Sequence, residues 1–282
     1  MPLRPRLPGR TEEGRSADTG RPHEGAQEVR TEAGPESSPV HEALASAASR
    51  RLDWPDCQNI RDLGGLPRPG GLTRSRVLIR SDHLGHLTEP GREAMQAYGV
   101  ATVIDLRSPG EVSRDPVPPS RSEGARYVHA PLIDDANMNN IGDAGNMLER
   151  YLMIVEKRPE AFRDVFQQVA EAEGGVLFHC FAGKDRTGLV AAMLLELAGV
   201  AHEDIAGDYA ETDRQLARQY EVWIGEADPD KRAAFRDELR CPPDRILGVL
   251  DHLQQKWGGV EGYLEASGMI PADIDRLSTK LA

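Results

Sequence analysis

The sequence predicts an α/β fold, with a mostly parallel central sheet flanked by helices and a helical C-terminal part. Short apolar runs of the kind that form buried strands alternate with segments whose apolar residues recur at helical spacing. Strands connected through helices usually pair in parallel, with the helices on the faces of the sheet. Beyond residue 197 the chain reads as helix, with breaks at Pro229, at Pro242-Pro243 and at Gly258-Gly259.

The expected elements follow one another along the chain. Residues 59–71 are rich in Gly, Pro and Asn and predict a loop or turn region. Residues 89–98 predict a helix, because Thr88 can cap its start, Pro90 stands in its first turn and Gly99 follows its end. We further expect strands over 77–80, 101–106, 127–132 and 176–179, a flexible loop over 134–146, two helices within 147–172 broken near Pro159, and an apolar helix over 187–197.

Residues 1–50 differ in composition from the rest of the chain. They contain almost no large apolar side chains and are dominated by Arg, Glu, Gly, Pro and Ser. Because such a segment cannot bury enough apolar surface to offset its ordering entropy, we expect a disordered tail over 1–50 and one folded domain over 51–282. No apolar run follows the basic start of the tail, and no run is long enough to span a membrane. We therefore expect neither a signal peptide nor a transmembrane segment.

Charge and cysteine content narrow the classes of function. A formal net charge of −12 argues against broad nucleic-acid binding, and an anionic substrate would need locally concentrated positive charge. The three cysteines, Cys57, Cys180 and Cys241, are widely spaced and odd in number, which favours reduced thiols and a cytoplasmic location. His83 and His86 have no further ligands nearby, so we predict no metal site and no cofactor.

Residues 179–188 read HCFAGKDRTG and stand between a short apolar strand and an apolar helix. A loop of this length can curl round a phosphate with its N–H groups pointing inward, and the helix that follows adds its positive N-terminal end. Gly183 lets the backbone approach closely. Arg186 offers a planar fork of donors to two phosphoryl oxygens, and the positive field favours the thiolate form of Cys180. A thiolate is a nucleophile, so the motif predicts covalent phosphoryl transfer.

Two neighbours of Cys180 can assist this chemistry. His179 can orient the loop, and Thr187 can donate a hydroxyl hydrogen bond to the sulfur when the thiophosphate is hydrolysed. A lone cysteine is more often a small buried hydrophobe. A buried loop that also carries charged residues is costly unless it meets an anion, so the whole motif favours a phosphate site over that alternative.

Asp105 closes the apolar run at 101–106 and is a candidate proton donor. Like Cys180, it falls at the carboxyl end of a predicted parallel strand. Reactive residues of such sheets gather at that edge, so we expect Asp105 and Cys180 to face the same crevice. The alternative is that Asp105 and Arg107 form a structural pair.

The decapeptide resembles the signature loop of the tyrosine phosphatase superfamily. It is most similar to that of the atypical bacterial tyrosine and lipid phosphatases, which carry Lys-Asp before the Arg. Residues 59–62 (NIRD) and 104–108 (IDLRS) resemble two further motifs of that branch, and Asp208-Tyr209, Gly259 and 262–264 resemble landmarks downstream. The resemblance covers residues 51–282, leaves out the tail, and implies the tyrosine-phosphatase fold for the domain.

The resemblance also implies roles for individual residues. Cys180 is expected to be the nucleophile, Arg186 to hold the phosphate, and Asp105 to be the general acid that protonates the leaving oxygen. Asp185 is a second candidate for the acid. Substrate contacts are expected from Phe181, Ala182, Gly183, Lys184, Asp185, Thr187, Arg61 and Asp62, the last two of which could equally form a structural salt bridge.

The substrates implied are phosphotyrosine proteins, with dual specificity and phosphoinositides left open. A cation at Lys184 could meet a second phosphate, as on an inositol ring. In the bacterial branch that the sequence resembles, the Lys-Asp pair accompanies activity on phosphoinositides as well as phosphoproteins. The stretch at 134–146 is shorter than the insertion that forms part of a lid in that branch, which implies a more open cleft. Export without a leader and the oligomeric state are also left open.

Two functions of other classes remain as alternatives. A catalytically inactive phosphate-binding module would be expected to lack Cys180 or Arg186, and both are present. A sulfur- or arsenate-handling enzyme could also use a Cys-Arg loop. Sulfurtransferase loops are usually one residue shorter, and arsenate reductases carry theirs near the N-terminus with the acid downstream. Here the loop is central and Asp105 precedes it.

Overall fold

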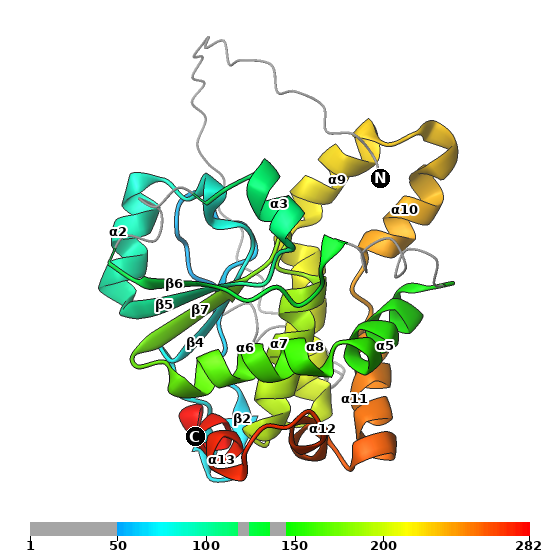
Figure 1. The fold of residues 1–282 in the computed structure, drawn as a ribbon. Helices are drawn as coiled ribbons and strands as arrows, with labels where there is room; N and C mark the ends of the chain where they lie inside the picture. The colour runs from blue at the N-terminus through cyan, green and yellow to red at the C-terminus, as the bar shows by residue number, and fades with distance from the viewer. Residues whose placement is uncertain (1–49, 118–123, 136–144) are drawn as a thin grey trace, which may run out of the picture.

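The computed structural model describes residues 50–117, 124–135 and 145–282, which build a central sheet with helices on both faces (Figure 1). The tail expected over 1–50 lies outside the described residues apart from Arg50. That residue is buried and hydrogen-bonded to Asp208, so it packs with the folded domain. The loop expected over 134–146 also lies outside the described residues apart from its two ends.

The sheet has five strands within the described ranges, in the order β1-β4-β7-β5-β6. β7 pairs in parallel with β4 and β5, β6 is parallel to β5, and β1 is antiparallel to β4. The expected mostly parallel sheet is therefore confirmed. The strands are β1 (Arg61–Asp62), β4 (Leu78–Ser81), β5 (Val100–Asp105), β6 (Arg126–His129) and β7 (Gly175–His179), with β2 (Pro67–Arg68) and β3 (Gly71–Leu72) forming a separate antiparallel pair.

Helices make up most of the remaining structure, and all the elements described after β7 are helical, as expected. In the first part of the chain they are η1 (Leu84–His86), α2 (Glu89–Tyr98), α3 (Pro109–Arg114), α5 (Met147–Lys157) and α6 (Pro159–Glu171). After β7 they are α7 (Asp185–Leu197), α8 (His202–Gln215), α9 (Ala217–Glu226), η3 (Pro229–Lys231), α10 (Arg232–Leu239), α11 (Pro243–Trp257), α12 (Val260–Ala266) and α13 (Pro271–Lys280).

Helix ends follow the proline and glycine signals of the sequence. α2 spans the expected residues and ends at Gly99, whose φ of 93° is left-handed. Thr88 stands at its N-cap position but makes no capping hydrogen bond through its side chain. The break expected near Pro159 is confirmed, because α5 ends at Lys157 and α6 begins at Pro159, where a missing N–H is harmless.

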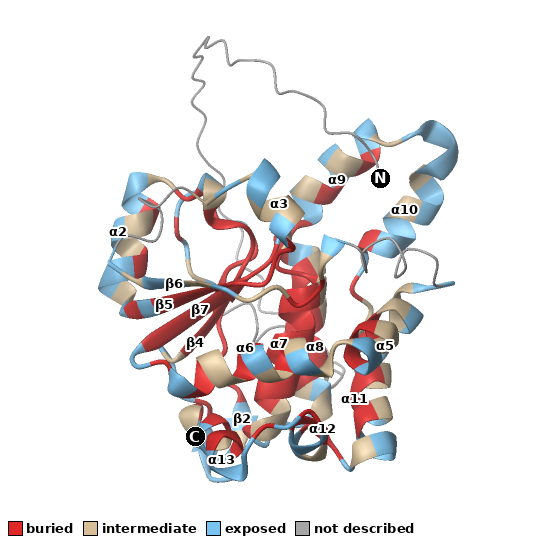
Figure 2. Cartoon of the chain, in the orientation of Figure 1, coloured by how far each residue is buried: buried red, intermediate tan, exposed pale blue. Residues whose placement is uncertain are grey.

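The central strands are buried on both faces (Figure 2). Successive side chains of a strand point to opposite sides. Leu177 and Ile79 accordingly pack in a core with Met95 of α2. Their neighbours Phe178 and Leu78 join the larger core of helices α5 to α8 and α11 to α13. α7 is buried along most of its length, so the strand and helix that flank residues 180–184 are both anchored in that core.

The carboxyl ends of the parallel strands meet at one edge of the sheet. Asp105 and Ser81 both stand opposite His179 in register, so the residues that follow β4, β5 and β7 gather at the same place. In the described ranges, no helix is both long enough and apolar enough to cross a membrane.

Candidate active site

A short loop joins β7 to α7 at the carboxyl edge of the sheet. Cys180 directly follows β7 and is 2% exposed, and α7 begins at Asp185. Gly183 has a φ of +65°, and a Cβ placed there would lie 2.5 Å from the carbonyl oxygen of Ser81. Only glycine therefore lets the loop pass this close to the end of β4.

Two carbonyl groups of this loop are hydrogen-bonded to a side chain, whereas three of its N–H groups have no acceptor among the described residues. Asn59 donates its amide to the Ala182 oxygen at 2.9 Å and to the Gly183 oxygen at 3.0 Å. By contrast, the N–H groups of Ala182, Gly183 and Lys184 donate to no acceptor among the described residues. Free N–H groups that lead into the positive end of a long helix form a nest for an anion.

Arg186 is nearly buried in the first turn of α7 and is paired with Glu111 of α3. Its Nη2 donates to Oε1 of Glu111 at 2.8 Å, and its Nη1 bonds Oε2. Burial would raise the pKa of Glu111, but the hydrogen bonds and charge of Arg186 outweigh it and lower the pKa to about 2. Ser108 completes a capping box with Glu111, which fixes the carboxylate at the start of α3.

Glu111 is a residue of the site that the sequence reasoning missed. The pattern Ser108-x-x-Glu111 is a recognisable helix-start signal, and the adjacent Pro109 supports it. That signal could have placed Glu111 at the beginning of a helix. It carries no information about a partner on α7.

Asp105 is fully buried at the end of β5 and is surrounded by hydrogen-bond donors. Arg107 donates to it through Nε at 3.0 Å and Nη2 at 2.6 Å, and the hydroxyl of Tyr127 donates at 2.7 Å. Burial acts to raise the pKa of Asp105, but His179, whose Nε2 lies 3.7 Å away, and Arg107 hold it well below its usual range. In this arrangement Asp105 is an ionised acceptor, and the pair with Arg107 that the sequence suggested is present.

His179 and Thr187 flank the loop on its buried side. His179 Nδ1 lies 3.1 Å from the carbonyl oxygen of Cys180, and burial lowers its pKa. Thr187 is fully buried, and its hydroxyl has no hydrogen-bond partner among the described residues. An unpartnered hydroxyl at this place is available to a group that enters or forms in the loop.

Lys184 and Asp185 face α5 and α10. The ammonium of Lys184 donates to the carbonyl oxygens of Glu238 at 2.8 Å and Leu239 at 3.3 Å, where α10 ends with unsatisfied carbonyls. Asp185 accepts a hydrogen bond from the hydroxyl of Tyr151, and its side chain is 32% exposed. Lys184 thus ties α10 to the loop, while Asp185 keeps access to solvent.

Phe181 and Ala182 contact the helices that rise beside the loop. The ring of Phe181 stacks on Trp223 of α9, with centroids 6.2 Å apart. Ala182 packs against a small apolar cluster that contains Leu216, Tyr220, Ile224 and Leu239. The helices α9 and α10 therefore rest on the loop through apolar contacts as well as through Lys184.

Arg61 and Asp62, both expected to contact substrate, are buried in β1. Arg61 donates to Asp208 of α8 at 3.0 Å through Nε. The carboxylate of Asp62 accepts from the N–H groups of Gly64 at 2.7 Å and Arg76 at 2.6 Å. The hydroxyl of Tyr98 in α2 also donates to Asp62. Arg61 thus forms a salt bridge, but with Asp208 and not with Asp62.

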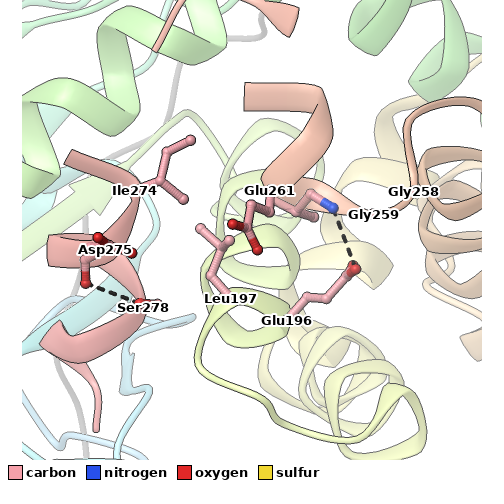
Figure 3. A pocket seen from close by; sticks show the side chains of 9 residues that line it. Glu196, Leu197, Gly258, Gly259, Glu261, Ile274, Asp275 and Ser278 are labelled. Atoms are coloured by element: carbon pink, nitrogen blue, oxygen red, sulfur yellow. Dashed lines mark hydrogen bonds between the residues drawn. The ribbon is translucent and has the colours of Figure 1, made fainter. Parts of the chain in front are cut away.

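A separate hollow lies at the other end of α7, between α7, α12 and α13 (Figure 3). Its volume is about 200 Å³, and it is lined by residues that include Glu196, Glu261 and Asp275. Since α7 rises about 1.5 Å per residue, Glu196 stands roughly 16 Å from the start of the helix beside the loop. This hollow is distinct from the loop.

The chain is similar to bacterial phosphatases. A tyrosine-protein phosphatase of Nostoc commune is 33% identical over 217 residues, which is 73% of this chain and 74% of that protein. The triple specificity protein phosphatase PtpB of Mycobacterium tuberculosis is 28% identical over 277 residues, 80% of this chain and 96% of that protein. The solved structure of TpbA from P. aeruginosa aligns over 69% of this chain and 88% of that chain, with 18% identity and a TM-score of 0.38.

The family assignment rests on the whole folded region and not on the loop alone. The model of the tyrosine phosphatase family matches residues 52–282, which confirms the resemblance seen in the motifs. The relatives named above cover most of the same region. The chain therefore belongs to the tyrosine phosphatase family and is a phosphoric monoester hydrolase of that type.

Proposed function

We propose that this enzyme hydrolyses phosphotyrosine in proteins through a covalent thiophosphate on Cys180. The observation that carries the proposal is the loop itself. Cys180 stands at the end of a buried strand, and Arg186 sits in the first turn of α7. Between them, the N–H groups of Ala182, Gly183 and Lys184 have no acceptor among the described residues. A phosphate dianion in this nest would receive backbone hydrogen bonds, the field of the helix and the guanidinium fork.

The reaction divides into two displacements at phosphorus. In the first, the thiolate of Cys180 attacks, a sulfur–phosphorus bond forms, and the ester bond to the tyrosine oxygen breaks as that oxygen takes a proton from a carboxylic acid. In the second, water attacks phosphorus and gives its proton to the resulting carboxylate. The sulfur–phosphorus bond then breaks, and inorganic phosphate leaves. Arg186 and the loop N–H groups stabilise the charge on the equatorial oxygens in both steps.

Asp105 and Asp185 remain the two candidates for that acid. The sequence favours Asp105, but its carboxylate is fully buried and engaged by Arg107 and Tyr127. Asp185 is partly exposed and stands at the start of α7, directly after the loop. It accepts a hydrogen bond from Tyr151 and pairs with Lys184 at 3.3 Å, and its exposure lets it exchange a proton with solvent and with a leaving group. These contacts support Asp185 as the acid and Asp105 as the residue that holds Arg107 and His179 in place.

Activity on phosphoinositides and phosphoserine is the finer part of the proposal. The relative from Mycobacterium tuberculosis is named a triple specificity phosphatase, and Lys184 supplies a cation next to the loop. To meet a second phosphate, Lys184 must leave the carbonyls of Glu238 and Leu239. A ligand phosphate is a stronger partner for an ammonium than a neutral carbonyl, which supports that exchange.

The deciding experiment compares a phosphotyrosine peptide, a phosphoserine peptide and phosphatidylinositol phosphates as substrates. Wild type should hydrolyse the phosphotyrosine peptide, Cys180→Ser should not, and Cys57→Ser should match wild type because Cys57 lies in the separate core beside α2. Lys184→Met should reduce turnover of phosphoinositides more than that of phosphotyrosine. Full turnover by Cys180→Ser would contradict the covalent route, and an unchanged substrate ratio in Lys184→Met would assign Lys184 to anchoring α10 alone.

We also infer that the enzyme works in a reducing compartment such as the cytoplasm. All three cysteines are buried, and their odd number and wide spacing support a compartment that keeps thiols reduced. Fractionation of cells with an antibody to this chain would test that location.

A further inference from the structure

Beneath the loop, three arginines share one buried carboxylate. Asp208 of α8 accepts hydrogen bonds from Arg50 at 2.7 Å, from Arg61 at 3.0 Å and from Arg80 at 2.6 Å. All four side chains are buried, and we call them the Asp208 cluster. The sequence analysis noted Asp208 only as a landmark of the resemblance and assigned no role to Arg80.

The Asp208 cluster reaches the loop by two routes. Arg80 donates directly to the carbonyl oxygen of Gly183 through Nη2 at 2.7 Å. Arg61 donates to the side-chain oxygen of Asn59 at 2.6 Å, and the amide of Asn59 in turn donates to the carbonyls of Ala182 and Gly183. Asp208 therefore holds Arg80 directly and Asn59 through Arg61, and these are the two side chains that bind the loop carbonyls.

Fixing these two carbonyls also fixes the N–H groups that a phosphate would use. In a trans peptide the carbonyl of one residue and the N–H of the next point in opposite directions from a rigid plane. With the Ala182 and Gly183 oxygens held against the cluster, the N–H groups of Gly183 and Lys184 must point to the other side. Those are two of the N–H groups that donate to nothing among the described residues.

The charge of the Asp208 cluster also favours the binding of an anion in the loop. The three guanidinium groups keep the pKa of Asp208 far below its usual range despite its burial, so the carboxylate is ionised. Burial and the charge of Arg61 lower the pKa of Arg80 to about 10, which still leaves it charged at neutral pH. Within the Asp208 cluster three guanidinium groups therefore face a single carboxylate, which favours an anion in the neighbouring loop.

We propose that Arg80 and Asp208 are positioning residues for the phosphate loop. Asp208 holds the guanidinium of Arg80 against the Gly183 carbonyl, so the nest is formed before substrate arrives and needs no rearrangement during the reaction. This inference rests on the proposed function of the Cys180 loop and adds the residues that organise it. A preformed nest is the arrangement that stabilises a transition state most strongly.

The test compares variants that keep or remove the hold on Gly183. Arg80→Met should weaken binding of inorganic phosphate, measured by calorimetry, and lower kcat/KM for 4-nitrophenyl phosphate, each by about 10- to 100-fold. Arg68→Met is the matched control, because Arg68 donates to a carbonyl, that of Ala198, at the far end of α7. It should keep wild-type values. Wild-type phosphate affinity in a folded Arg80→Met protein would overturn the proposal.

Two further variants test the positioning role of Arg80 and Asp208 if Arg80→Met does not fold. Arg80→Lys retains the charge but lacks the fork that spans Asp208 and Gly183, so phosphate affinity should fall while the thermal midpoint stays near wild type. Asp208→Asn removes a negative charge beneath the loop. If charge alone mattered, phosphate would bind more tightly, whereas loss of positioning predicts weaker binding. Unchanged or tighter binding in either variant would contradict a positioning role.

The wild-type enzyme and Cys180→Ser separate this inference from the function on which it rests. Cys180→Ser should bind phosphate without turning over substrate. If wild type neither binds phosphate nor hydrolyses 4-nitrophenyl phosphate, the proposed function fails and the positioning role fails with it. If wild type does both and the Arg80 and Asp208 variants match it, only the positioning role is overturned.

Discussion

Glu111 holds Arg186 by both branches of its guanidinium, with Nη2 2.8 Å from Oε1 and Nη1 bonded to Oε2. The two residues lie on α3 and α7, so this contact connects the segment after β5 to the loop after β7. Glu111 occupies one N–H donor on each of two nitrogens of the guanidinium that we propose to hold the phosphoryl group. We therefore expect substrate to share or displace Glu111, and the carboxylate to keep the fork in its plane until then.

Glu111→Gln should lower kcat/KM for a phosphotyrosine peptide by about 10-fold or more, because Arg186 loses the charged partner that orients it. Steady-state kinetics would measure the effect. Glu265→Gln, at an exposed position of α12, is the control and should leave the kinetics unchanged. A Glu111→Gln enzyme as active as wild type would show that Arg186 needs no such partner.

The same pair should make stability depend on pH in the acid range. Folding lowers the pKa of Glu111 from the ordinary 4.5 to about 2, so the pair stabilises the fold fully above about 4.5 and progressively less as pH falls toward 2. The difference in free energy of unfolding between wild type and Glu111→Gln should thus be constant near neutral pH and shrink below pH 4.5. Urea denaturation across this range measures it, and a pH-independent difference would refute the linkage.

Asp185→Asn should mainly reduce turnover, whereas Asp105→Asn should mainly reduce the stability of the fold. Loss of the acid should reduce turnover of phosphotyrosine by about 100-fold or more, but reduce turnover of an ester with a good leaving group much less. We expect that signature from Asp185→Asn. Asp105→Asn leaves Arg107 buried without its charged partner, which should destabilise the fold by about 3–5 kcal/mol. If Asp105→Asn instead loses turnover of phosphotyrosine but keeps that of an ester with a good leaving group, Asp105 and not Asp185 is the general acid.

Gly183→Ala should disable the loop, because its Cβ would lie 2.5 Å from the Ser81 oxygen and its φ is positive. We expect loss of phosphate binding together with a lower thermal midpoint. Gly225→Ala on α9 is the control, since a Cβ there meets nothing within 4 Å, and it should be neutral or stabilise by roughly 0.5–1 kcal/mol. A Gly183→Ala enzyme that binds phosphate normally would show that the loop has more room than the structure gives it.

Cys180 should be the cysteine most readily alkylated or oxidised. Burial raises the pKa of Cys241 to about 12 and that of Cys57 higher still, so both stay as unreactive thiols. Peptide mapping after limited treatment with iodoacetamide or peroxide should find Cys180 modified first. Inorganic phosphate or vanadate should slow that modification by occupying the loop. Equal labelling of the three cysteines would argue against an activated thiolate.

Much of the framework was predictable because its signals are local. The apolar runs gave strands near their observed positions, and Gly99 and Pro159 marked helix boundaries through their own backbone preferences. The spacing of Cys180 and Arg186 also predicted the short loop between β7 and α7, because that motif lies within ten consecutive residues. Patterns of this kind need no knowledge of the rest of the chain.

The partners of the charged side chains were not predictable in the same way. Lys184 was expected to contact substrate, and its bonds to the carbonyls at the end of α10 could not be foreseen from the sequence. Glu111 and Asp208 were not expected in the site because their contacts join segments far apart in the chain. Such pairings depend on how elements pack, which the composition and periodicity of a single sequence do not specify.

If the loop binds phosphate as proposed, the product of the reaction contributes to folding, because three buried arginines face the single carboxylate of Asp208. An anion that binds only the native loop raises the free energy of unfolding with the logarithm of its concentration, by about 2.7 kcal/mol at a hundred times its dissociation constant. Product inhibition and resistance to unfolding would then both be set by one equilibrium, the binding of phosphate to the native loop. At high phosphate concentration the same bound ion would both stabilise the fold and inhibit the enzyme. A substrate that displaces the ion would then bind a loop that already has its binding conformation.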